Sequence, residues 1–226
     1  MKKTLSALIL SMLFCSVAAA SPLTDYSQGS TAIDLTMRNV HSHWQELYGS
    51  STTYSYQGTK YNGDFSYTLG LGNRLAVQYR YFAPQFNNYY SYQTIGHEMK
   101  TSEINVLYQL NKNVSVFAGR VHAENAWTNS YSKYYNWADY EYVDRNIAQV
   151  GVVGNRSIGS KTTLWGSLGL GRDLTDFTVG VGYKFSPVME FNVDYRALTI
   201  KKFWENIGYT DEMKSKGLGF GLTYKY

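Results

Sequence analysis

The chain ends in GLGFGLTYKY, residues 217–226, where side chains of two kinds alternate. Because successive residues of a β-strand point to opposite faces, the alternation predicts a strand with one apolar face. The opposite face carries three glycines, Thr223 and Lys225, and the glycines leave room for larger charged side chains of neighbouring strands. The apolar face consists of Leu218, Phe220, Leu222, Tyr224 and Tyr226.

Two segments that precede this strand show the same alternation. Residues 177–185 and 189–199 both place apolar or aromatic side chains at odd positions and mostly polar or small ones at even positions. The three residues Ser186-Pro187-Val188 between them keep both apolar faces on one side, and Pro187 lies outside the hydrogen-bonded ladder. This register sets Lys184 opposite Glu190, where we expect a cross-strand ion pair.

Seven further segments alternate, which brings the predicted number of strands to ten: 31–40, 61–71, 75–81, 102–110, 114–124, 144–155 and 162–171. Short turns (72–74, 111–113, 157–161, 186–188) alternate with long segments (41–59, 83–99, 125–143, 202–212), and 172–175 is a short exception. An even strand number with short and long connections in alternation is typical of a closed antiparallel transmembrane β-barrel. We therefore predict an all-β barrel of ten strands, with eight as the next alternative, over a soluble periplasmic β-sandwich.

In one predicted strand, 114–124, the alternation of apolar and polar side chains is inconsistent. If Val114 and Ala118 face outward, Arg120 faces lipid as well. A β-bulge near Gly119 would turn Arg120 inward, so we expect one there.

The N-terminus carries an export signal. Lys2 and Lys3, an apolar run and Ala18-Ala19-Ala20 form a signal peptide over residues 1–20, which leaves residues 21–226 as one barrel domain. Cleavage also removes Cys15, the single cysteine, and excludes disulfides from the mature protein. Without Lys2 and Lys3, 21 basic residues become 19 against 17 acidic ones, a balance that does not favour a nucleic-acid partner.

Composition and a family resemblance support this fold. With 22 Tyr, 20 Gly and only 3 Pro, the chain suits a barrel with lipid outside and a polar interior. Residues 170–196, LGRDLTDFTVGVGYKFSPVMEFNVDYR, together with GLGFGLTYKY, resemble the small OmpA-like outer-membrane β-barrel superfamily. The resemblance implies a barrel in the bacterial outer membrane of a Gram-negative-type organism, in contact with outer-membrane lipid, and no catalytic residue.

The apolar residues of the last strand also predict an insertion signal. A terminal aromatic preceded by apolar residues at every second position is what the barrel-assembly machinery reads, by adding the exposed strand to its own sheet edge. Here the signal consists of Leu218, Phe220, Leu222, Tyr224 and Tyr226.

The predicted inner face collects charges of both signs. Asp64 lies diagonally across from Arg80, and acidic and basic residues occur in nearly equal number, so we expect ion pairs that plug the lumen. A narrow porin for small solutes is the alternative. The inward residues are Asp34, Arg38, Asp64, Arg80, Glu103, Lys184, Glu190, Asp194 and Arg196.

Four histidines are the candidates for chemistry. His41 and His43 flank Ser42 and could serve a base or a metal, but no acidic cluster adjoins them. His122 shares a face with Arg120 and Glu124 and could pair with a carboxylate; His97 belongs to no motif. We expect no enzyme activity, cofactor or metal, and keep an outer-membrane hydrolase as a second alternative.

Aromatic side chains crowd the long connections. Such rings offer rigid surfaces to an extracellular glycan or protein, or form a girdle at the membrane interface. We therefore predict a structural or adhesin-like surface-interaction role. The candidate binding residues are Tyr131, Tyr134, Tyr135, Trp137, Tyr140 and Tyr142.

Overall fold

The protein forms one closed antiparallel sheet. The structure, a computed structural model, describes residues 25–49, 51–89, 93–131, 138–206 and 209–226; the predicted signal peptide lies outside them. Among these residues no helix is long and apolar enough to cross a membrane. The strands are β1 (Thr31–Tyr48), β2 (Ser51–Gly72), β3 (Leu75–Phe82), β4 (Gln85–Tyr89), β5 (Gln93–Asn111), β6 (Val114–Tyr131), β7 (Ala138–Ser157), β8 (Thr162–Gly171), β9 (Leu174–Lys184), β10 (Met189–Asn206) and β11 (Tyr209–Lys225).

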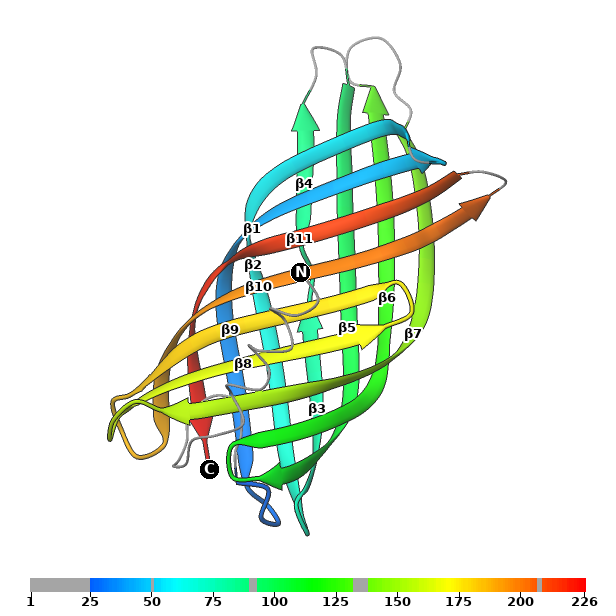
Figure 1. Cartoon of the computed structure of the whole chain (residues 1–226). Coiled ribbons are helices and arrows are strands. Elements are labelled where there is room, and N and C mark those ends of the chain that lie inside the picture. Colours follow the sequence, from blue (N-terminus) through cyan, green and yellow to red (C-terminus); the bar gives the residue numbers. More distant parts are fainter. Residues whose placement is uncertain (1–24, 50, 90–92, 132–137, 207–208) are drawn as a thin grey trace.

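These segments make ten strands of the barrel wall, because β3 and β4 together form one wall strand. Both pair with β5, and the wall strand is interrupted at Ala83-Pro84, where proline has no N–H to donate. The first and last strands also pair, from Ala32 opposite Lys225 to Tyr48 opposite Tyr209, which closes the barrel (Figure 1). The ten-stranded antiparallel prediction is confirmed, and its eight-stranded alternative is wrong.

The outer face divides into an apolar band and a polar zone. Outward side chains near the short turns are apolar or aromatic, as in β11, where Leu218, Phe220, Leu222 and Tyr224 are all exposed. Farther from those turns the outward side chains become polar. In adjacent strands this change from apolar to polar occurs within about two ladder positions. The change falls between Met37 and Asn39 in β1, Ile104 and Ser102 in β5, Ala118 and Arg120 in β6, Ala148 and Asn146 in β7, and Leu218 and Lys216 in β11. We take this line as the outer boundary of the bilayer, since charged side chains on the lipid face are destabilising.

This boundary corrects the prediction for β6. Its pairing with β7 runs from Val114 to Ser130 without a register shift, so the bulge expected near Gly119 is absent. Arg120 does point outward, and so do His122 and Glu124. They avoid lipid because they lie beyond the boundary, where the wall is in water. The irregularity lies instead before the turn, between Gln109 and Asn111.

The long connections were also predicted wrongly. Most residues of 41–59, 83–99, 125–143 and 202–212 continue the strands, so the barrel extends well beyond the bilayer on that side. The alternation of inward and outward side chains persists there, but the outward residues are polar and hide the contrast that marks a strand in lipid.

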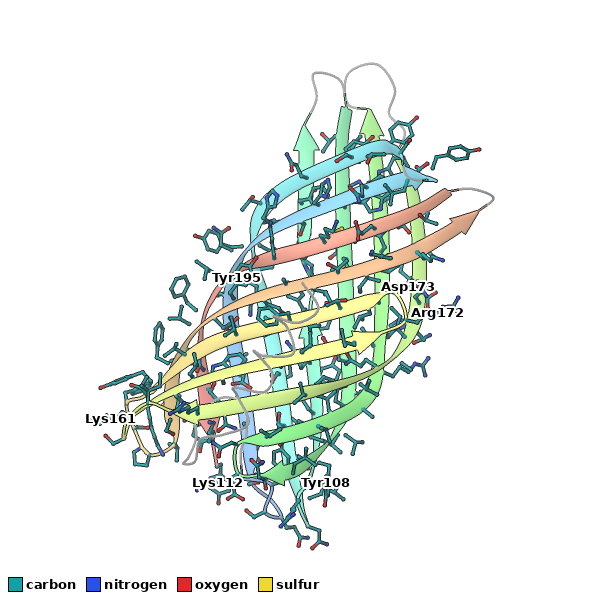
Figure 2. All side chains as sticks on the ribbon, in the orientation of Figure 1. Tyr108, Lys112, Lys161, Arg172, Asp173 and Tyr195 are labelled. Carbon is teal, nitrogen blue, oxygen red and sulfur yellow. The ribbon has the colours of Figure 1, made fainter. Side chains whose placement is uncertain are left out.

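The hairpin of β8 and β9 is lower than its neighbours. Its turn holds Arg172 and Asp173 and ends below the upper ends of β7 and β10, whereas Lys112 and Lys161 mark the opposite, short-turn end (Figures 1 and 2). Above this turn, Arg145 of β7 donates hydrogen bonds to the carbonyl oxygens of Lys201 and Lys202 in β10 and lies 3.3 Å from the Asp173 carboxylate. Arg145 therefore joins the two strands across the low part of the wall.

Candidate functional site

The lumen is closed first at its short-turn end, by residues before β1. Gly29 donates a hydrogen bond to the Gly70 carbonyl (3.0 Å) and Gly72 donates one to the Tyr26 carbonyl (2.9 Å), which fixes this segment against β2. The Tyr26 side chain is 2% exposed and packs in an apolar cluster with Ala32, Ala76, Leu107, Val153 and Phe117. No alternating pattern surrounds Tyr26 in the sequence, so this lower closure was not predicted.

Above Tyr26 lies a small polar chamber. Its volume is about 80 Å3, room for roughly five to eight waters if each needs about 10–15 Å3. Asp34, on its wall, accepts hydrogen bonds from Ser66 (2.9 Å) and Thr223, and the Thr223 hydroxyl also bonds to Asn192. The chamber is too small to act as a water-filled pore.

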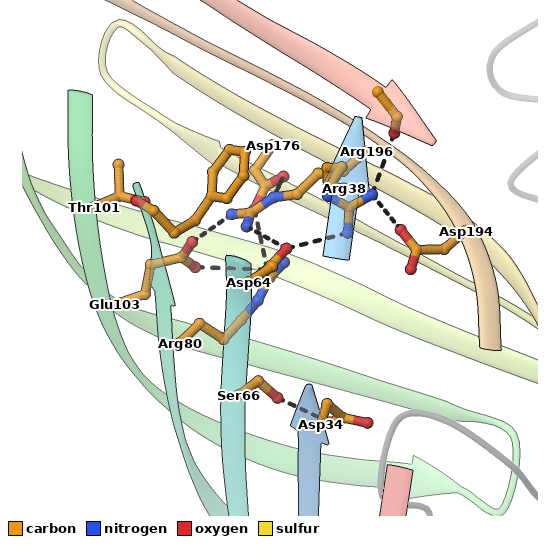
Figure 3. A network of polar contacts seen from close by, with 12 residues as sticks. Asp34, Arg38, Asp64, Ser66, Arg80, Thr101, Glu103, Asp176, Asp194 and Arg196 are labelled. Carbon is orange, nitrogen blue, oxygen red and sulfur yellow. Dashed lines mark hydrogen bonds and ion pairs between the residues drawn. The ribbon is translucent and has the colours of Figure 1, made fainter. Parts of the chain in front are cut away.

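An ion-pair network covers the chamber, and Arg196 is its centre (Figure 3). The guanidinium group is fully buried and lies 3.2 Å from Asp64, 2.7 Å from Glu103 and 2.8 Å from Asp176. Asp64 links it to Arg38 at 3.1 Å, and Arg38 also pairs with Asp194. Buried charges are tolerated when each is paired and hydrogen-bonded, as here.

Arg80 joins the network from β3, although not through the predicted partner. The register does place it diagonally across from Asp64, but its ion pairs reach Asp176 at 3.0 Å and Glu103 at 3.6 Å. Asp176 was missing from the predicted inner face. It follows the parity of Thr178 and Lys184, and could have been found by extending that parity two residues backward.

Near the short-turn end, Lys184 lies opposite Glu190, as the turn parity predicts. The ion pair seen at Glu190 is with Lys225 of β11, at 3.2 Å. The expected Lys184–Glu190 ion pair stays a prediction.

Glycines make the space for this network. A Cβ atom on Gly219 would lie 2.6 Å from Thr36 Cγ2 and 3.0 Å from Arg38 Cζ, and one on Gly180 would lie 2.7 Å from Asp194 Cβ. The role predicted for the glycines of the last strand is visible at Gly219, and Gly180 of β9 has the same role. Larger side chains would displace the charged groups.

An apolar core closes the lumen above the network. Phe82 lies between the two layers: the Arg196 Cζ atom is 4.6 Å from its ring centroid, and its ring packs within the core. The other buried members are Val40, Phe86, Met99, Val121, Ala123, Ile147, Leu174, Leu198, Ile200, Phe203 and Met213. This core lies at and beyond the bilayer boundary.

His97 is buried in this upper core among aromatic rings. Its imidazole stacks on Trp44 and on Phe86, each with a centroid distance of 5.0 Å, and lies 5.4 Å from Tyr56. Neither ring nitrogen has a hydrogen-bond partner among the described residues. His97 lies beyond the bilayer boundary, and burial lowers its pKa from 6.5 to about 3. It is therefore a neutral packing residue, with no base or metal role suggested by its surroundings.

The other three histidines lie on the outer wall beyond the boundary. His41 and His43 bond to the hydroxyls of Thr59 (3.1 Å) and Ser55 (2.7 Å). His122 does meet a carboxylate, Glu124 at 3.3 Å, as the shared face suggested, but outside the barrel. No group of three or more potential metal-ligating residues occurs in the described part of the chain.

Most candidate surface-binding side chains lie outside the part of the chain that the structure describes. Tyr134, Tyr135 and Trp137 lie outside the described residues, and the side chains of Tyr131 and Tyr140 do so as well. Tyr142 is described and is 47% exposed on β7. The proposed binding surface stays a prediction.

No protein-family model and no curated protein sequence matches the chain. Among solved structures, the outer-membrane protease OmpT of Escherichia coli is 11% identical, with a TM-score of 0.64 over 87% of this chain and 97% of that one. The translocator domain of the autotransporter NalP of Neisseria meningitidis is 8% identical, with a TM-score of 0.52 over 100% and 94%. The attachment invasion locus protein Ail of Yersinia pestis is 8% identical, with a TM-score of 0.45 over 86% and 99%.

The likenesses to OmpT and to the NalP translocator domain establish the fold of an outer-membrane β-barrel. Together with the apolar outer band, they place the chain in the bacterial outer membrane. The same fold serves a protease and a translocator domain, so it determines neither a specific role nor whether this chain is an enzyme.

Proposed function

We propose that this protein is a sealed outer-membrane barrel with a structural or adhesin-like role. It acts through the part of the barrel wall that projects beyond the bilayer. The observation that carries the proposal is the closure of the lumen at three levels: Tyr26, the ion-pair network and the apolar core. Such a lumen supports neither diffusion of solutes nor access of a substrate from within. What remains available to a partner is the outside of the extended strands.

A measurement of conductance separates this role from that of a narrow porin. The mature protein, refolded into planar bilayers, is expected to give no channel events, because the described lumen has a cavity of only about 80 Å3 between the Tyr26 cluster and the apolar core. A lasting, protein-dependent current would overturn the sealed barrel. Heat-modifiable migration on gels serves as the control that the protein has folded.

A deletion tests the surface role. Removal of residues 129–142 eliminates the aromatic-rich segment of the sequence that includes the end of β6 and the start of β7, but keeps Asn125 opposite Val143, with 126–128 as the connection. Cells that display the shortened barrel should bind glycan arrays or epithelial monolayers less than cells with the full chain, while heat-modifiable migration persists. Equal binding by cells with the shortened and the full chain would exclude residues 129–142 as the binding surface.

The hydrolase alternative has its own test. If any hydrolytic activity is detected, the His43→Ala and His122→Ala variants are expected to retain it, because these side chains lie on the outer wall. Loss of activity in either variant would favour an enzyme instead.

A further inference from the structure

One sector of the outer wall carries an excess of basic side chains just beyond the bilayer boundary. On β11, Lys214 and Lys216 point outward and are exposed, and on the adjacent β1 the outward residues are His41 and His43. The register sets His41 opposite Lys216 and His43 opposite Lys214. Directly opposed side chains in an antiparallel pair have Cβ atoms about 4.5–5.5 Å apart, so the four basic groups share one small area.

The other charged side chains described in this sector do not cancel the excess. Glu212 pairs with Lys214 and, at 3.4 Å, with Lys201 of β10. Among the side chains that the structure describes in this sector, Lys201, Lys214 and Lys216 against Glu212 leave a charge of +2 before either histidine is protonated. Among the side chains described at the same level, the wall formed by β5, β6 and β7 holds Lys100 and Arg120 against Glu98, Glu124 and Asp144, a charge of −1. The basic area is thus specific to one side of the barrel.

Opposed basic residues disfavour one another unless an anion lies between them. His43 shows the effect: its pKa is lowered, first by burial and then by the charges of Lys214 and His41, with Lys216 adding to them and Glu212 opposing. From β2 it faces the uncharged Ser55, which holds its Nε2. An anion bound at this place would relieve the repulsion and raise the pKa of His43.

Below the basic area, within the apolar band, residues of β1, β10 and β11 together with β2 and β3 line an apolar groove. Its volume is about 500 Å3, within the roughly 300–1,000 Å3 typical of small-ligand sites. Gly63 of β2 helps to open it, because a Cβ atom there would meet nothing within 4 Å. Its walls include Leu35, Met37, Phe65, Phe220 and Leu222. A groove that faces lipid at this depth suits an acyl chain.

We propose that this wall binds a phosphate-bearing lipid of the outer leaflet, with its headgroup on Lys214, Lys216, His41 and His43 and an acyl chain in the groove beside Gly63. The two parts of the site meet at the bilayer boundary, between Leu218 and Lys216. A soluble anion could use the upper part alone, but only a lipid uses both.

Native mass spectrometry of the mature protein in detergent tests the site with three probes. Phosphatidylglycerol should form a 1:1 adduct at concentrations where phosphatidylcholine with the same chains does not. Glycerol phosphate, which has the phosphate without the chains, should displace the lipid only at more than about hundredfold excess, because it lacks the apolar contacts in the groove. Equal binding of the two lipids, or displacement by equimolar glycerol phosphate, would overturn a lipid site.

Variants locate the site on the molecule. Since a lysine near an anionic surface contributes about fivefold, the Lys214→Gln/Lys216→Gln variant should bind phosphatidylglycerol roughly thirtyfold more weakly. The matched control, Lys100→Gln/Arg120→Gln on the opposite wall, should bind like the wild type. Gly63→Trp fills the groove without meeting a neighbour at Cβ, and should also weaken binding. Wild-type affinity in the lysine variant or in Gly63→Trp would overturn the proposal.

A spectroscopic measurement keeps the proposal testable if the double variant does not fold. NMR titration of His43 in wild-type protein should give a higher pKa in mixed micelles with phosphatidylglycerol than with phosphatidylcholine. An identical pKa in both would contradict headgroup binding at this position.

Discussion

Arg196 pairs with three carboxylates in the middle of the barrel, and this single side chain offers the most direct test of the network. Its replacement by Ala leaves Asp64, Glu103 and Asp176 buried with fewer cations. Loss of one partner of a buried ion pair costs about 3–5 kcal/mol, so Arg196→Ala should lower the free energy of unfolding in urea by that amount. Arg172→Ala is the control, because Arg172 is 86% exposed and its removal should change little. Equal stability of the two variants would contradict the central role of Arg196.

His97 gives the barrel a pH dependence. Its pKa is about 3 in the folded state and about 6.5 when unfolded, so the unfolded chain binds more protons between these values. Stability is therefore fully present above pH 6.5 and falls as the pH drops toward 3, with a loss of about 2–3 kcal/mol from this residue at pH 4.5. His97→Phe keeps the aromatic packing and should remove that loss. Urea unfolding of both proteins at pH 7 and pH 4.5 measures the difference, and parallel losses would show that His97 does not cause it.

At the scale of the strand, β5 crosses the boundary between lipid and water. Val106 lies in the apolar band, 50% exposed, and Ser102 lies beyond Ile104 on the same face. An arginine costs about 2–4 kcal/mol at the middle of the bilayer and about 0–1 kcal/mol near its edge. Val106→Arg should therefore destabilise the protein in vesicles far more than Ser102→Arg. Similar losses would mean that the boundary is misplaced.

The strands also show what the sequence can and cannot reveal. Where lipid lies outside, as at Phe185 and Met189, the contrast between faces predicts strand, turn and register together. Beyond the boundary both faces of β1 contain polar residues, as at His41 and Ser42, and the period is hidden. The prediction of a bulge near Gly119 was wrong because Arg120 lies beyond the bilayer edge. The position of that edge depends on the whole wall and is not visible in one strand.

The candidate site was predictable in kind but not in detail. Arg80 and Asp64 could be assigned to the inner face from parity, yet their partners come from strands far along the chain, such as β9 and β10. Which carboxylate meets which guanidinium depends on side-chain lengths and on space next to Gly219. Tyr26 belongs to no repeating pattern, so its burial follows only from tertiary packing.

At the scale of the whole molecule, the lumen is closed at several levels, so the loss of one closure should leave it sealed. Tyr26→Ala removes the lower closure but leaves the ion-pair network and the upper core in place. The variant should remain without conductance in planar bilayers, like the wild type. A current from Tyr26→Ala would show that the segment before β1 is the essential seal.

The pairing of β1 with β11 has a consequence for the time course of folding. Ala32 and Lys225 are partners although they are 193 positions apart (225 − 32), whereas most other ladders join strands that follow each other along the chain. Contacts between distant residues form slowly, because a long loop must close before they stabilise anything. The hairpins can therefore form early, and the seam is expected last. Until then residues 217–226 have an unpaired backbone edge toward β1, so the strand that completes the wall is the last to be paired on both edges.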